Sequence, residues 1–299
     1  MQVSETMVSL GAFSSSVKTA VGQDDPYLND LYIYECSKEI ESRLGDQAQQ
    51  WYKNTALMMF KPDAIVGRRG QKILAFCKEH GFRVKNSELV ELNRHSMREI
   101  WRYDWQSFPI ERLSFSTLWY TVSKTVVILF EQDDSFSQPA SERLNDLKGG
   151  PRYPEQTSSL RSTLNPPNVL LNFVHVADHP IDVVREIGIL FDEFSRGTFI
   201  EGRGSASQHD AAAKLDEHIN TLEAMYPAHD LSFENSLTRL EHAGLIEHQK
   251  AENLREMKNR QLNISLTEMH ATLDMANVPA LHTWDVIASL SYVIAPQIK

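Results

Sequence analysis

Two short segments of the chain end on side chains that suit phosphate chemistry. An apolar run that begins at Leu57 leads to Lys61, and a second run that begins at Asn172 leads to His175. Glu186 follows that histidine by eleven residues, in a segment with helical spacing. An imidazole can attack phosphorus, a carboxylate can fix the imidazole tautomer, and an ammonium group can neutralise phosphate oxygens. The combination indicates phosphoryl transfer through a histidine.

Each of these side chains also has an ordinary interpretation. A lysine at a strand end is usually solvated, and a histidine beside an apolar strand is more often structural than catalytic. Arginines in a polar loop are normally surface charges. The phosphate hypothesis therefore depends on a fold that brings Lys61 and His175 together.

Strands and helices alternate between residues 55 and 194, and this pattern could position both segments. Short apolar or β-branched runs predict strands at 55–60, 82–90, 125–131 and 168–175. Helical spacing of apolar residues predicts helices at 27–51, 70–80, 96–103, 113–122 and 180–194, with Ser96 as a cap. The polar segment 135–167 predicts a long loop with little regular structure, and loops of that length are often functional.

The order of these elements predicts an α+β fold, a ferredoxin-like sandwich with a four-stranded antiparallel sheet. We expect an N-terminal arm and helix (1–52), the alternating region (53–200) and an α-helical C-terminal extension (201–299). Segment 201–208 predicts a linker, 246–272 one long or broken helix, and 284–294 a final apolar helix. Apolar stripes in the extension indicate core packing, with a partner-binding surface as the alternative.

The composition is that of an ordinary globular protein. The chain has 299 residues, of which 41% are hydrophobic and 23% charged. A net charge of -10 argues against non-specific binding to nucleic acid or anionic membranes. Cys36 and Cys77 lack metal-binding spacing and are expected to be reduced thiols. We recognise no secretory signal and no apolar run that would span a bilayer, so we expect a cytoplasmic protein with no membrane or nucleic-acid partner.

Residues 55 to 195 resemble a nucleoside diphosphate kinase. The resemblance rests on the runs Lys61-Pro62-Asp63, Gly81-Phe82, Asn172-Phe173-Val174-His175 and Glu186-Ile187-Gly188. It implies that a nucleoside triphosphate such as ATP phosphorylates His175, and that a nucleoside diphosphate or a more specialised phosphorylated acceptor then takes the phosphoryl group. It also implies Mg²⁺ carried by the nucleotide phosphates, without a metal site in the protein. The family commonly assembles, so we expect a homo-oligomer.

The same resemblance gives roles to individual residues. The catalytic groups would be His175 as nucleophile, Glu186 as its hydrogen-bond partner and Lys61 as a charge on the phosphates. The expected nucleotide-binding residues are Lys61, Tyr103, Leu113, Arg143, Arg161 and Asn172. Among these, the arginines would hold the phosphates and Leu113 would contact the base.

The chain departs from the family pattern beside the histidine. The family has Gly-Ser where this chain has Val176-Ala177, and an arginine where it has Leu171. The lost hydroxyl is compatible with reduced activity or with a different acceptor. Two other functions therefore remain open, a nucleotide-binding regulatory or scaffold module that acts through the extension, and a structural subunit with a vestigial pocket.

Overall fold

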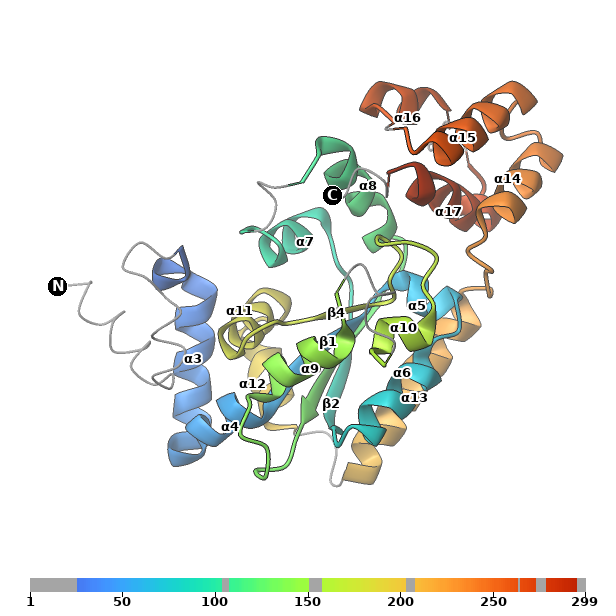
Figure 1. Ribbon diagram of the computed structural model, residues 1–299. Helices are drawn as coiled ribbons and strands as arrows, with labels where there is room; N and C mark the ends of the chain where they lie inside the picture. The colour runs from blue at the N-terminus through green and yellow to red at the C-terminus, as the bar shows by residue number, and fades with distance from the viewer. Residues whose placement is uncertain are drawn as a thin grey trace.

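A four-stranded antiparallel sheet lies among helices in the computed structural model of the chain (Figure 1). The model describes residues 26–103, 108–150, 158–202, 208–262, 264–272 and 278–294. The strands are β1 (Thr55–Phe60), β2 (Arg83–Val90), β3 (Thr125–Glu131) and β4 (Val174–Val176). Their order is β2-β3-β1-β4, with every neighbouring pair antiparallel. This is the ferredoxin-like sheet that the sequence predicts.

The central strand β1 brings the two chemically interesting segments together. All of its residues are buried, since it pairs with β3 on one side and β4 on the other. Met59 pairs with His175 in the ladder to β4. The Lys61 N–H then donates to the Phe173 carbonyl at 2.9 Å. The lysine and the histidine therefore lie close together on neighbouring strands, near the C-terminal end of β1.

Helices fill the connections between the strands. Before β1 come η1 (Pro26–Asn29), α3 (Leu31–Leu44), η2 (Gly45–Gln47) and α4 (Ala48–Asn54). Between β1 and β3 lie α5 (Pro62–Val66), α6 (Gly70–Glu79), α7 (Arg94–Ile100) and α8 (Ile110–Tyr120). After β3 come α9 (Ala140–Lys148), α10 (Leu160–Leu164), α11 (Pro180–Leu190) and α12 (Glu193–Glu201).

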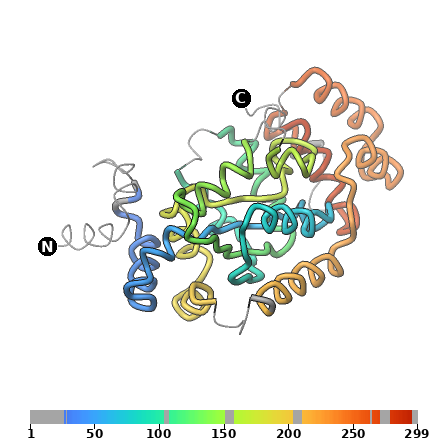
Figure 2. Tube along the Cα trace, turned by 60° about the horizontal axis from the view of Figure 1, so that its bottom comes forward, coloured from blue at the N-terminus to red at the C-terminus, as the bar shows by residue number. Residues whose placement is uncertain are grey.

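The C-terminal extension is helical, as predicted, and it contacts the sheet as well as the helices. Its members are α13 (Gln208–Met225), α14 (Phe233–His242), α15 (His248–Arg260), α16 (Leu266–Thr272), η5 (Ala280–His282) and α17 (Thr283–Ile294). Helix α13 lies along the edge strand β2, where Lys214 bonds to Asn86 and Glu88. This contact covers an edge that would otherwise be open to pairing with another chain. The other helices gather at one end, where α17 packs on α8 (Figures 1 and 2).

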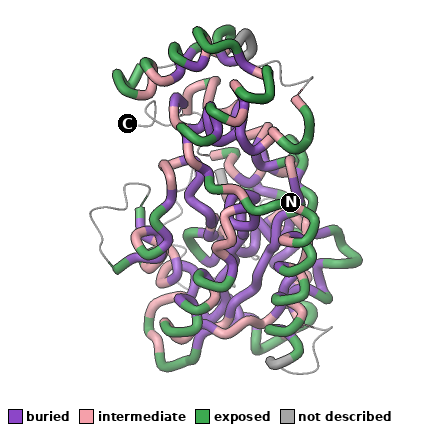
Figure 3. The backbone as a smooth tube through the Cα atoms, turned by 90° about the vertical axis from the view of Figure 1, so that its right-hand side faces the viewer, coloured by how far each residue is buried: buried purple, intermediate pink, exposed green. Residues whose placement is uncertain are grey.

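One connected core runs through the sheet and into the extension. Strands β1 and β3 are buried almost throughout, and buried residues continue into the helices around them (Figure 3). In α17, Val286, Ile287 and Val293 are fully buried. No helix in the described part of the chain combines the length and the apolarity that a bilayer span requires.

The long loop predicted at 135–167 is wrong, because the segment contains α9 and α10. Leu144 and Leu160, one in each helix, are fully buried and anchor them to the core. Most residues of α9 are polar, so its apolar spacing is too sparse to stand out in the sequence. Residues 151–157 of this segment lie outside the described part of the chain.

The strand predicted at 168–175 is mostly irregular, and only its end joins the sheet as β4. The Asn168 side chain accepts the N–H groups of Leu170 and Leu171, both at 3.0 Å, which closes a turn. Phe173 then takes a left-handed backbone with φ of 70°. Neither conformation can continue the hydrogen-bond ladder of a strand. The apolar residues of this segment do not reveal either conformation.

Several predicted helix boundaries also change. The helix predicted at 180–194 ends at Leu190, because Asp192 accepts two N–H groups and starts α12. Helix α7 is capped by Asn93, whereas Ser96 takes the third position and closes a capping box. The segment 246–272 is broken into α15 and α16, with Gln261 in the left-handed region at the end of α15. The predicted arm, residues 1–25, and the centre of the predicted linker, 203–207, lie outside the described residues.

Candidate functional site

His175 and Glu186 form the centre of the candidate site. The Nε2 atom of His175 lies 2.7 Å from Oε1 of Glu186, and the two side chains are 17% and 6% exposed. An ionised carboxylate can only accept, so this contact places the imidazole proton on Nε2 and leaves the lone pair on Nδ1. Nδ1 has no hydrogen-bond partner among the described residues. The pair therefore presents an unprotonated ring nitrogen, Nδ1 of His175.

The position of α11 fixes Glu186 beside β4. Gly188 allows α11 to approach α3 closely, since a Cβ at this residue would lie 2.6 Å from the Tyr32 carbonyl. The buried Arg185 also donates from Nε to Oδ2 of Asp30 at 2.5 Å, which ties α11 to the residue that caps α3. Both contacts hold α11 against the start of α3 and so fix the position of Glu186.

Lys61 is held at the end of β1 by acceptors from the segment before β4. Its Nζ donates to the Leu170 carbonyl at 2.7 Å and to Oδ1 of Asn172. The Trp119 ring lies 4.5 Å from Nζ. Burial lowers the pKa of Lys61 to about 7, and Arg161 and Arg112 act in the same direction. Its charge is therefore sensitive to the arrival of a phosphate near neutral pH.

Asp63 does not line a cavity and instead holds the backbone of the segment from Asn172 to His175, called the catalytic segment below. The residue is fully buried, and its Oδ2 accepts the Phe173 N–H at 2.7 Å. Burial raises the pKa of Asp63. Because Phe173 is the residue with the left-handed backbone, this bond stabilises the conformation that carries the chain from Asn172 to His175.

Arg161 is a buried cation without a carboxylate partner in the described structure. Its two terminal nitrogens donate to the carbonyls of Gly149 at 2.8 Å and Val174 at 3.5 Å. Its Nε is buried with no hydrogen-bond partner among the described residues. Burial lowers the pKa of Arg161 to about 10, so the group stays charged at neutral pH. An uncompensated guanidinium of this kind suits an anionic ligand.

A cavity of about 130 Å³ joins these groups. Its lining residues are Lys61, Trp101, Phe108, Arg112, Leu113, Ser116, Trp119, Tyr120, Arg161, Val169, Leu170, Asn172, Val174 and His175. Cations and aromatic rings are interleaved in this wall, because Lys61 lies over Trp119 and Arg112 over Phe108. The Trp101 ring meets the His175 imidazole edge-on, with ring centroids 5.1 Å apart.

Most of the residues predicted from the sequence meet at this cavity. His175, Lys61, Arg161, Asn172 and Leu113 line it, and Glu186 lies directly behind the histidine. Their roles in binding and catalysis stay predictions. Asn172 differs in detail from the expected ligand donor, because its Nδ2 donates to the Val169 carbonyl at 2.8 Å and its Oδ1 accepts from Lys61.

Arg143 does not reach the cavity, so its predicted place beside the phosphates is wrong. It lies in α9, where it donates to the carbonyl of His80 and to the Gln132 side chain. Its guanidinium also stacks on Phe82 and Phe136, at 4.7 and 3.8 Å from the ring centroids. The helix that the sequence interpretation missed turns this arginine toward the end of α6 and the residue that precedes β2.

Tyr103 is also outside the cavity, contrary to the prediction. Its hydroxyl donates to Oδ2 of Asp30 at 3.0 Å, and its ring packs on Tyr27 and Arg185. The aromatic residue that meets the histidine is Trp101, two positions earlier. Tyr103 instead helps to fix the N-terminal helices against α11.

Three features of the site were missed from the sequence. Arg112 lines the cavity just before the segment predicted as a helix, and Trp119 and Tyr120 close the wall from its end. Lys148 lies nearby and its Nζ is 3.3 Å from Oδ1 of Asp178, with burial lowering its pKa. The adjacent aromatic pair at the end of a helix was the signal that could have indicated a ring-lined pocket.

The carboxylate of Glu186 is only half satisfied. Its Oε2 is buried and has no hydrogen-bond partner among the described residues. Ala177, where the resembled family has a serine, brings no hydroxyl to this region. One oxygen of this carboxylate is therefore not used by the hydrogen bond to His175.

The donor set of the cavity fits nucleotide phosphates better than a bare cation. Arginine and lysine side chains line the site, and in the described part of the chain no three histidine, cysteine or acidic side chains converge. A Mg²⁺ ion would then be held mainly by the phosphates of the nucleotide.

Comparison with known proteins finds similarity among solved structures only. No protein-family model and no curated protein matches the chain. A nucleoside diphosphate kinase from Aquifex aeolicus shares 20% identity over 47% of this chain and 96% of its own, with a TM-score of 0.38. An NDP kinase from Pyrobaculum aerophilum shares 17% over 47% and 97%, with a TM-score of 0.37. One from Halobacterium salinarum in complex with CDP shares 17% over 48% and 90%, also with a TM-score of 0.37. At this level of similarity, function must be inferred from the site itself.

Proposed function

We propose that the chain is a phosphotransferase that works through a phosphorylated His175. It takes the γ-phosphoryl group of a nucleoside triphosphate and passes it to a nucleoside diphosphate or a related phosphorylated acceptor. The contact of 2.7 Å between His175 Nε2 and Glu186 Oε1 carries this proposal, because it leaves Nδ1 unprotonated at a cavity lined by cations.

The reaction proceeds in two balanced steps. The Nδ1 lone pair attacks the γ-phosphorus, the bond from phosphorus to the bridging oxygen breaks, and the nucleoside diphosphate leaves with that electron pair. The imidazole then carries a positive charge, which Glu186 stabilises through the Nε2 proton. In the second step an acceptor phosphate oxygen attacks the phosphorus, and the nitrogen–phosphorus bond returns its electrons to Nδ1.

The cations of the cavity stabilise the charge that spreads over the phosphoryl oxygens. Arg161 can offer its terminal N–H groups, and Lys61 gains its proton when a phosphate approaches. Arg112 and Lys148 add positive charge on the same side. A Mg²⁺ ion on the nucleotide would supply further neutralisation of the phosphates.

Aromatic side chains supply the surface for the nucleobase. Trp101, Phe108 and Trp119 line the cavity together with the aliphatic side chain of Leu113. The present volume of about 130 Å³ is smaller than the roughly 300–1,000 Å³ of typical ligand pockets. We therefore expect α7 and α8 to move apart from β4 when a nucleotide enters.

Radiolabelling tests the proposal. Incubation with ATP labelled at the γ-phosphate should leave an acid-labile label on the wild-type chain and none on His175→Ala. Transfer of that label to added nucleoside diphosphates then identifies acceptors. Label that persists on the His175→Ala variant would show that another residue is the nucleophile.

A regulatory nucleotide-binding module is the second candidate. It is favoured by the hydrogen bonds that the polar side chains of the site already make within the protein. Lys61 and Asn172 bond to each other and to main-chain carbonyls, so both are already occupied in the described structure. This alternative predicts saturable ATP binding by calorimetry together with no label on the wild-type chain.

A further inference from the structure

A second cavity lies beside the catalytic segment, where the extension meets α5 and α10. Its volume is about 680 Å³, and its lining residues are Val66, Gly67, Arg68, Arg69, Asn165, Pro167, Phe173, Ala228, His229, Asp230, Leu231, Ser232 and Tyr292. Asn172 lines the first cavity and its neighbour Phe173 lines this one. The short segment that leads to His175 therefore separates the two cavities.

Arg69 is the unusual residue of this second cavity. Its side chain has no hydrogen bond or ion pair with any described residue, and its Nε is buried without a partner. The guanidinium carbon lies 5.5 Å from the ring centroid of Phe173. Arg68, by contrast, donates to the carbonyls of Ile65, Glu223 and Tyr226. Two adjacent arginines thus differ completely in how their donors are used.

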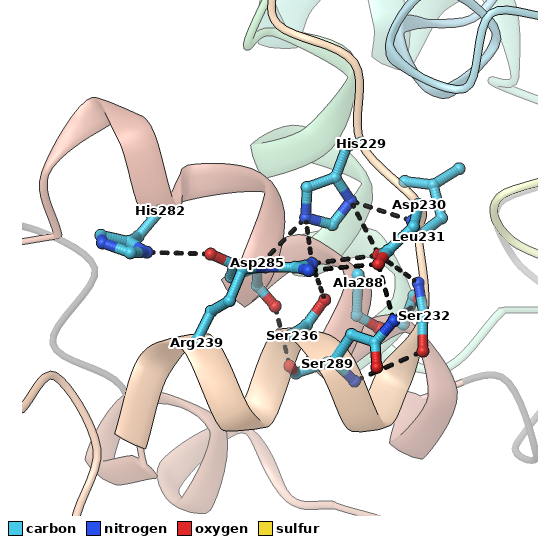
Figure 4. Close-up of polar contacts among 12 residues, drawn as sticks. His229, Asp230, Leu231, Ser232, Ser236, Arg239, His282, Asp285, Ala288 and Ser289 are labelled. Carbon is cyan, nitrogen blue, oxygen red and sulfur yellow. Dashed lines mark hydrogen bonds and ion pairs between the residues drawn. The ribbon is translucent and has the colours of Figure 1, made fainter. Parts of the chain in front are cut away.

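The carboxylates near this cavity are already engaged elsewhere. Asp230 accepts both terminal nitrogens of Arg239, at 3.0 and 3.1 Å, and these bonds hold its pKa well below the usual range. Asp285 accepts from His229 at 3.0 Å and from Nε of Arg239 at 2.6 Å (Figure 4). His229 is satisfied as well, because its Nδ1 accepts the Leu231 N–H. Neither of these carboxylates forms an ion pair with Arg69.

We propose that this second cavity binds a small oxyanion, through a phosphate or carboxylate group on Arg69. A guanidinium offers five N–H donors in a planar fork that matches two oxygens of such a group. Asn165, exposed at the end of α10 with no described partner for its amide, adds a neutral donor to the same wall. The rings of Phe173 and Tyr292 give the rest of the ligand an apolar surface.

An anion bound at this site would change the position of the catalytic segment. Phe173 contacts Arg69 with its ring, and its backbone holds Lys61 and Asp63 by the bonds described above. Helix α10 carries Asn165 at its end and Arg161 four positions earlier. An anion on Arg69 is thus placed to change the positions of two phosphate-binding groups. This consequence, unlike the binding itself, rests on the proposed phosphotransfer.

Nuclear magnetic resonance of the arginine Nε–H groups tests the binding directly. The Arg69 signal is identified by its absence in Arg69→Lys, a variant that keeps the charge and loses the fork. Inorganic phosphate, pyrophosphate and citrate are titrated separately at constant ionic strength set with chloride. We expect a saturable shift of the Arg69 signal. The Asn165 side-chain amide signal reports on the same cavity, and by this signal we expect at least about tenfold weaker binding in Arg69→Gln.

Two further variants give the controls. Arg260→Gln removes the same charge from an exposed ion pair in α15 and should leave the titration unchanged. Arg161→Gln should weaken anion binding in the first cavity while the Arg69 signal still shifts. A response to phosphates alone or to citrate as well tells which oxyanion the site prefers.

An Arg69 signal that stays in place with all three anions overturns the proposal, as does unchanged binding in Arg69→Gln. The consequence for catalysis is measured separately, as the rate of His175 labelling with and without the anion. If the wild-type chain takes no label while the Arg69 signal shifts, the phosphotransfer proposal fails and the anion site stands.

Discussion

Replacing Glu186 with glutamine should slow phosphorylation of His175 without weakening nucleotide binding. The contact of 2.7 Å to Nε2 becomes a charge-assisted bond when the imidazole turns positive, and such bonds contribute about 1.5–3 kcal/mol. Glutamine removes the negative charge, and its amide can also donate to Nε2, which moves the ring proton to the attacking nitrogen. A loss of this size corresponds to a fall of about 10- to 150-fold in the rate of label formation.

The matched control is Glu142→Gln. Glu142 also faces a histidine, His179, but the pair is 3.5 Å apart and both side chains are substantially exposed. Rapid-quench labelling with ATP measures the rate, and calorimetry measures ATP affinity for the same variants. If Glu186→Gln is labelled at the wild-type rate, the charge of Glu186 does not stabilise the His175 imidazolium. An equal loss of rate in Glu142→Gln would lead to the same conclusion.

Three other predictions follow from the site. Arg161→Gln should weaken ATP binding by about tenfold or more, measured by calorimetry, because it removes a buried cation that has only carbonyl partners. Arg143→Gln should leave ATP affinity unchanged while lowering the free energy of unfolding by about 1–2 kcal/mol in urea titrations, because its guanidinium contacts His80, Phe82 and Phe136, away from the cavity. ATP affinity should fall as pH rises through about 7, where Lys61 loses its proton, and Lys61→Met should flatten that profile. Since this folded pKa lies below the ordinary 10.5, the unfolded chain binds the extra proton between these values, and the lysine's contribution to stability rises with pH across that window.

The sheet could be predicted because its strands are short and apolar. The run from Thr125 to Glu131 is β-branched and buried, and the structure reproduces its bounds. The segment before His175 has the same apolar character, yet the Asn168 turn and the left-handed Phe173 remove most of it from the ladder. The left-handed backbone of Phe173 is held by Asp63 and Lys61, residues far away in sequence, so no local pattern could reveal it.

The candidate site shows a similar division. The pairing of His175 and Glu186 could be predicted from their spacing of eleven residues. A short connection joins β4 to α11, and it brings the two side chains into contact. Arg143 and Tyr103 were assigned by position along poorly patterned segments, and the polar helix α9 and the irregular end of α7 turn them elsewhere. Arg112 shows the reverse case, since only the packing of α8 brings it to the cavity.

The identity of the phosphorylated nitrogen is the most direct test of whether Nδ1 of His175 is the nucleophile. Phosphorus-31 resonance of the chain after brief exposure to ATP distinguishes a phosphate on Nδ1 of a histidine from one on Nε2. The contact between His175 Nε2 and Glu186 predicts a single signal from the Nδ1 isomer, absent in His175→Ala. A phosphate on Nε2, or a signal that survives the His175→Ala substitution, would contradict the account.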